Sequence, residues 1–134
     1  MEHLIWAGKY VAEKRPDKII HIGDHWDMPS LNGYDVGKKS FEGRRYTDDI
    51  AIGQYAMNLF MDPIRKAIEH GTKMHRNRWN PTFHFFLGNH EQRIHRAIDS
   101  DRKLEGLISY RDFQLEPEWK VYDYLVPVNL DGVN

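Results

Sequence analysis

Apolar positions along the chain follow helical spacing in some segments and form short continuous runs in others. In the first segment, five small or apolar residues share one helical face: Leu4, Ile5, Gly8, Val11 and Ala12. Pro16 follows them and marks the end of this helix. Residues 18–22 then form a short apolar run that stops at Gly23, which predicts a buried β-strand.

The clearest helical pattern begins near Asp48, because the apolar residues after it are spaced by three and four. This stripe consists of Ile52, Tyr55, Ala56, Leu59 and Phe60. Asp62 and Pro63 are residue types of a helix start, so we expect a second helix to begin there and to end at Gly71. Residues 32–46 are rich in glycine and basic residues, which predicts a loop.

Strands and helices continue to alternate in the second half of the chain. Residues 82–88 are short and aromatic, which predicts a second buried strand, and His84 within it is interpreted as a core or cross-strand histidine. Two helices should follow, at residues 90–98 and 103–113.

The end of the chain carries β-prone residues. They predict strands at residues 119–125 and 126–130, followed by a turn at Asp131-Gly132. The order of elements predicts an α/β fold with parallel central strands and flanking helices, in a single domain over residues 1–134.

Composition excludes several classes of protein. The chain has 134 residues, no cysteine and a net charge of −1, so neither a disulfide framework nor a thiolate metal site is available. No apolar stretch is long enough to cross a membrane, and the N-terminus lacks the pattern of a signal peptide, so we expect a cytoplasmic protein without a membrane partner. The balanced charge gives no global indication of nucleic-acid binding.

Two glycine-led motifs follow the two predicted strands. Residues 23–27 read GDHWD and residues 88–91 read GNHE. Because the carboxyl ends of neighbouring parallel strands meet at one edge of a sheet, we expect the motifs to lie side by side. Asp24 and Asn89 then offer oxygen ligands for a hard divalent cation, and nearby His25, Asp27 and His90 add ligand or proton-transfer capacity.

The pair of motifs, in this order and each after an apolar strand, resembles the calcineurin-like metallophosphoesterases, over roughly residues 3–91. The resemblance implies a phosphomonoesterase or phosphodiesterase that uses two divalent metal ions. It implies that Asp24 bridges the ions, that Asn89 binds the second ion, that His90 protonates the leaving oxygen and that Asp27 orients His90. Mn²⁺ is the first expectation for the metal, with Fe, Zn²⁺ and Mg²⁺ as alternatives.

The sequence departs from this family at two places. The family's D-x-H motif before the first helix and its later histidine motifs, including G-H-x-H, are absent from the 134 residues. We therefore expect an incomplete domain, an internal piece or a shortened gene product, with weak metal binding and little turnover. An exposed sheet edge would favour self-association. The alternatives are a non-catalytic domain that associates with a partner chain, or a piece of a DNA-processing nuclease.

Each candidate residue also has a structural interpretation. Asp24 and Asp27 could cap a short helix at residues 28–30, and Asn89 could cap the helix that follows it. Arg93 is a candidate for binding substrate phosphate, and otherwise pairs with an acidic neighbour such as Glu91.

The remaining histidines, the tryptophan of the first motif and the basic residues leave alternatives open. His25 is expected to line the substrate pocket or to be exposed, and Trp26 either floors that pocket or packs in the core. We interpret four other histidines as surface residues: His21, His70, His75 and His95. Two basic stretches are interpreted as solvated loops, although each could meet a nucleic-acid backbone: Lys38, Lys39, Arg44 and Arg45, and Lys73, His75, Arg76, Arg78 and Trp79.

Overall fold

A three-stranded parallel sheet organises the chain in this computed structural model, which describes residues 1–32, 45–74 and 78–132. The strands are ordered as in the sequence: β1 (Lys18–His21), β2 (Thr82–Phe86) and β3 (Lys120–Tyr122). Both strand pairs are parallel. The sheet and its flanking helices confirm the α/β fold class expected from the sequence.

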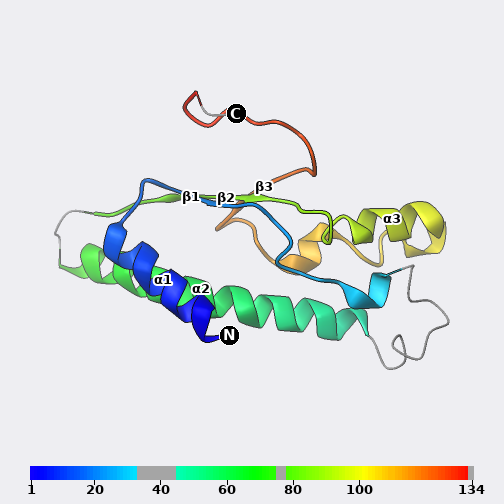
Figure 1. Cartoon of the computed structure of the whole chain (residues 1–134), viewed down its shortest axis with the longest axis horizontal. Coiled ribbons are helices and arrows are strands. Elements are labelled where there is room, and N and C mark those ends of the chain that lie inside the picture. The colour runs from blue at the N-terminus through cyan, green and yellow to red at the C-terminus, as the bar shows by residue number, and fades with distance from the viewer. Residues whose placement is uncertain (33–44, 75–77, 133–134) are drawn as a thin grey trace.

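Two long helices cover one face of the sheet (Figure 1). They are α1 (Glu2–Lys14) and α2 (Tyr46–Lys73). A third helix, α3 (Arg93–Ser100), lies beyond the carboxyl end of β2, and the C-terminal segment passes over the opposite face of the sheet (Figure 1). The site predicted from the sequence therefore lies at the end of the sheet where α3 begins.

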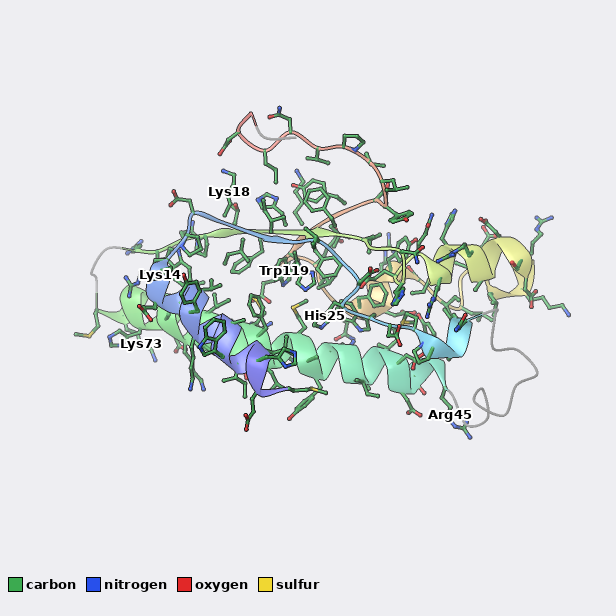
Figure 2. The ribbon with its side chains drawn as sticks, in the orientation of Figure 1. Lys14, Lys18, His25, Arg45, Lys73 and Trp119 are labelled. Carbon is green, nitrogen blue, oxygen red and sulfur yellow. The ribbon has the colours of Figure 1, made fainter. Side chains whose placement is uncertain are left out.

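The core fills the space between the sheet and α2. Alternation along the strands directs Ile19 of β1 and Phe85 of β2 into this layer, where Trp119 also lies (Figure 2). Its largest fully buried side chains are Trp26, Trp119, Phe85, Phe113, Met28, Met61, Ile64 and Ile94. Trp26 is 1% exposed and stacks on Phe113, so most of its side chain packs in the core.

His84 is a buried cross-strand histidine, as the sequence predicted. Its side chain is on the face of the sheet opposite the helices, between Thr82 and Tyr122. Nε2 lies 2.9 Å from the hydroxyl of Thr82, and Nδ1 lies 2.7 Å from the hydroxyl of Tyr122. Burial lowers the pKa of His84, with further lowering from Lys18 and Lys120.

The long helix differs from the prediction, because α2 continues through Asp62 and Pro63 without restarting. Proline removes one backbone hydrogen bond of a helix and normally kinks or ends it. Here the helix is held on both sides of Pro63, since Met61 and Ile64 are both completely buried in the core. Tertiary packing thus outweighs the local stop signal.

The C-terminal third also contains less regular structure than predicted. The expected helix at 103–113 is replaced by two 3₁₀ turns, η4 (Arg102–Leu104) and η5 (Tyr110–Phe113). Gly106 lies between them with φ +80°, a conformation that a helix does not contain. The expected strand at 119–125 is reduced to β3, and no second strand follows in residues 123–132.

The helix after the second motif and the short helix after the first lie close to their predicted positions. α3 begins at Arg93, three residues later than predicted. A single 3₁₀ turn, η1 (Pro29–Leu31), follows the first motif. The predicted loop at 32–46 and part of both basic stretches lie outside the described residues.

Within the described ranges, no helix combines the length and the apolar character that a membrane crossing requires.

Gly8 determines how closely α1 approaches α2. A Cβ atom at Gly8 would lie 2.1 Å from the carbonyl oxygen of Phe60, which is a backbone atom and cannot rotate away. We expect Gly8→Ala to lower the free energy of unfolding by about 1–3 kcal/mol, despite the higher helix propensity of alanine. Urea denaturation measures the change, and Lys9→Ala, at an exposed neighbouring position, should shift it by less than about 0.5 kcal/mol.

Candidate functional site

The two glycine-led motifs lie directly against each other. A Cβ atom at Gly23 would be 2.3 Å from the backbone nitrogen of Gly88, and one at Gly88 would be 2.4 Å from the backbone nitrogen of Asp24. Gly23 also has a φ of +84°, which favours glycine. Both glycines are therefore explained by the close approach of the two turns, and β1 and β2 bring them together because they are parallel neighbours.

The carboxylate of Glu91 joins the two motifs. Its Oε1 accepts hydrogen bonds from the backbone N–H groups of His25 (2.7 Å) and Trp26 (2.9 Å). Its Oε2 accepts from those of Asp24 and Gly88, both at 2.8 Å. Glu91 is completely buried. Four backbone donors thus satisfy a buried carboxylate, which holds the first motif against the second.

Asp24 and Asn89 lie on adjacent turns, as the sequence predicted. Asp24 adopts a φ of +55°, and its Oδ1 accepts a hydrogen bond from the backbone N–H of His90 at 2.9 Å. Both Asp24 and Asn89 are exposed to solvent. Arg96 lies over Asn89 and donates from Nη2 to the backbone oxygen at 2.7 Å and to Oδ1 at 3.3 Å.

His90 and Asp27 form a side-chain pair across the two motifs. Nδ1 of His90 lies 2.7 Å from Oδ1 of Asp27. The histidine side chain is 33% exposed and the aspartate 71% exposed, so the pair is open to solvent. When Nδ1–H donates to Asp27, Nε2 is the ring nitrogen that can exchange a proton with a bound molecule.

Arg93 is placed beside Asp27 and does not contact Glu91 in any described interaction. Its Nη1 donates to the backbone oxygens of Asp27 (2.5 Å) and Met28 (3.4 Å), and lies 3.7 Å from Oδ1 of Asp27. The guanidinium thereby fixes the end of the first motif. The side chain is 18% exposed.

His25 turns toward the long helix. Its Nε2–H donates to the backbone oxygen of Gly53 in α2 at 2.9 Å, and Figure 2 places the ring between the sheet and that helix. Burial lowers its pKa, partly offset by this hydrogen bond and by Glu91. Gly53 also leaves room for the neighbouring Trp26, because a Cβ atom at Gly53 would overlap the indole ring. This hydrogen bond commits one ring nitrogen of His25 to α2.

The sequence did not reveal the structural roles of Glu91 and His21. The sequence suggested Glu91 only as an acidic partner for Arg93, whereas the structure buries it completely. His21 was interpreted as a surface residue, but its ring stacks on Phe85 and its Nδ1 accepts the N–H of Gly23 at 3.1 Å. Burial and the neighbouring His25 lower the pKa of His21 to about 4.

Candidate metal ligands are few at this site. In the parts of the chain that the structure describes, no three histidine, aspartate or glutamate side chains gather closely enough to hold a metal ion. The oxygen atoms available near the two turns are those of Asp24 and Asn89, with Asp27 engaged by His90.

Comparisons with known proteins add one sequence similarity. No family model matches the chain, and no solved structure matches it. The Gene 54 protein of Mycobacterium phage L5 is 26% identical over 84 residues, which are 63% of this chain and 28% of the phage protein. The matched region thus spans less than a third of that relative, whose name states no activity.

Replacing the buried carboxylate tests its role in holding the motifs together. We expect Glu91→Gln to lower the free energy of unfolding by about 3 kcal/mol or more, because the amide NH₂ would face backbone donors that then lose their acceptor. Urea denaturation measures the loss. Glu13→Gln is the matched control at an exposed position and should change stability by less than about 0.5 kcal/mol. Equal stability of the two variants would contradict the assigned role.

Protonation of His21 should make the protein less stable in acid. The unfolded chain binds this proton below a pH of about 6.5, whereas the folded protein binds it only below about 4, so stability falls as the pH decreases through this window. We expect His21→Phe to remove about 2 kcal/mol of the stability difference between pH 7 and pH 5. Urea titrations at both pH values measure it. His70→Gln, at an exposed residue of α2, should keep the wild-type difference.

Proposed function

We propose that this chain carries part of the active site of a metal-dependent phosphoester hydrolase that uses two divalent cations. The observation that carries the proposal is the juxtaposition of the two motifs, with Asp24 and Asn89 on touching turns and the His90–Asp27 pair beside them. The likeness of GDHWD and GNHE to the calcineurin-like metallophosphoesterases supports the same assignment.

The chemistry of the donors fits a hard or borderline divalent cation. Asp24 offers a carboxylate whose Oδ2 accepts no hydrogen bond from the described residues, and Asn89 offers a neutral amide oxygen. Such oxygen donors suit Mn²⁺ or Mg²⁺, and the nearby histidine also permits Fe or Zn²⁺. Arg96 contacts Asn89 Oδ1 and would have to give up this contact when a cation binds there.

His90 would supply the proton that the leaving oxygen needs. Asp27 accepts from Nδ1 and orients the ring, so Nε2 can donate toward a phosphoester bound over the two turns. Asp27 is thus a positioning residue. The divalent cations, when bound, would activate water and neutralise charge that develops on the phosphoryl oxygens.

We expect slow turnover from this chain. Two protein ligands are fewer than the three that catalytic metal sites commonly use, so the affinity for the cation should be weak. The reaction should therefore depend steeply on the concentration of the added metal.

A second candidate is a non-catalytic domain that associates with another chain. The observation that favours it is the position of β1 at an edge of the sheet, where Ile20 is 51% exposed and Ile22 is 84% exposed. An unpaired strand edge with apolar neighbours can add a strand from a second chain.

Metal binding and hydrolysis, measured on the same variants, test the proposed function. We expect the wild type to bind Mn²⁺ weakly and to hydrolyse bis(para-nitrophenyl) phosphate slowly when Mn²⁺ is in excess. Asp24→Ala should lower Mn²⁺ affinity by about tenfold or more and abolish turnover, because it removes a ligand. His90→Ala should lower turnover by about a hundredfold, or to background, while Mn²⁺ affinity changes by less than about threefold.

Asp62→Ala is the matched control, since Asp62 is an exposed residue of α2. It should retain both properties of the wild type. Unchanged Mn²⁺ affinity in Asp24→Ala would contradict the proposed site. Absence of turnover together with dimerisation in analytical ultracentrifugation, abolished by Ile20→Lys, would favour the second candidate instead.

A further inference from the structure

A cavity of about 410 Å³ lies next to the proposed site, between η1 and α3. Asn89 and Arg93 form part of its wall, so it is continuous with the second motif. The wall consists of Leu31, Asn32, Asn89, Arg93, Arg96, Ala97 and Ser100. It therefore contains two guanidinium groups and no carboxylate.

The positive charge of this wall comes from one face of α3. Arg93 and Arg96 are three residues apart and lie on the same side of the helix, whereas Asp99 pairs with His95 and does not belong to the wall. By contrast, the cavity lined by Arg111 also has Glu116 and Asp123 in its wall. The cavity beside Asn89 is thus suited to an anionic group.

Arg96 has donors available for such a group. Its Nη2 contacts the backbone and side-chain oxygens of Asn89, and no carboxylate in the described ranges pairs with it. A guanidinium has five N–H donors in a planar fork, so Nε and Nη1 remain able to bind phosphate oxygens. Arg96 is exposed to solvent and is part of the cavity wall.

The rest of the cavity is larger and less polar than a phosphate ion requires. Leu31 and Ala97 provide apolar wall, while amide and hydroxyl groups provide a few polar contacts. This combination is typical of sites for small organic ligands. A nucleoside phosphate matches it, because it joins a phosphate to a flat ring system that can lie on apolar side chains.

We propose that this cavity binds a nucleotide-like part of the substrate, with its phosphate held by Arg96, next to the phosphoester that is cleaved. The inference deepens the proposed function and rests on it for the identity of the neighbouring reaction. The substrate class is therefore a phosphoester with a second phosphate on a nucleoside.

Binding of thymidine 3′,5′-bisphosphate in EDTA tests the inference without metal or turnover. Isothermal titration calorimetry should show saturable binding that weakens with added salt. Arg96→Gln should weaken it by about tenfold, because one charge-assisted contact is lost. Ala97→Phe, which fills the cavity and keeps both arginines, should also weaken it by about tenfold or more. Arg78→Gln, with the same loss of charge at the far end of β2, should stay within about twofold of the wild type.

Three results would overturn the inference: no saturable binding, equal affinity in Arg96→Gln, or equal affinity in Ala97→Phe. Equal affinities for inorganic phosphate and the bisphosphate would overturn its nucleoside part. Circular dichroism verifies that each variant is folded. Because these measurements contain no divalent cation, their failure leaves the Mn²⁺ and hydrolysis results on Asp24 and His90 as a separate test of the proposed function.

Discussion

One buried carboxylate, that of Glu91, holds together the end of this molecule where the two motifs meet. It accepts four backbone hydrogen bonds, three from the first motif and one from the second. A buried carboxylate without such donors would be strongly unfavourable, so the turns and the acid stabilise one another. The positions of Asp24, Asp27 and His90 all depend on this contact, because each belongs to one of the two turns.

The close approach of the turns adds a second constraint. Gly23 and Gly88 face each other without room for a side chain on either. The strands place these glycines together, and Glu91 then fixes the turns that follow. The polar side chains on and beside these turns differ in what they contact. Arg93 donates to the backbone oxygen of Asp27, whereas Asp24 and Asn89 are exposed to solvent. The proposed site is therefore open to solvent at Asp24 and Asn89, while Glu91 and Trp26 beneath the turns are buried.

At this end of the molecule, acidic and basic side chains lie on different segments of the chain. The carboxylates of Asp24 and Asp27 lie on the first motif, and the guanidinium groups of Arg93 and Arg96 lie on α3. A divalent cation and a phosphorylated ligand could therefore occupy neighbouring positions, each beside charges of the opposite sign. Because charges of both signs cancel in the sum, the overall net charge of −1 gives no indication that Arg93 and Arg96 lie together on α3.

The sequence by itself determined the order of elements and the neighbourhood of the two motifs. Periodic apolar residues identified α1 and the first part of α2, short apolar runs identified β1 and β2, and the parallel layout placed Asp24 next to Asn89. These features follow from local spacing and from the geometry of parallel strands. Tertiary structure alone decided the continuity of α2 through Pro63, since burial of the residues beside it outweighs a local stop signal. It also decided that Glu91 is buried, that His25 faces α2 and that Arg96 contacts Asn89, because those contacts depend on partners from 3 to 67 positions away.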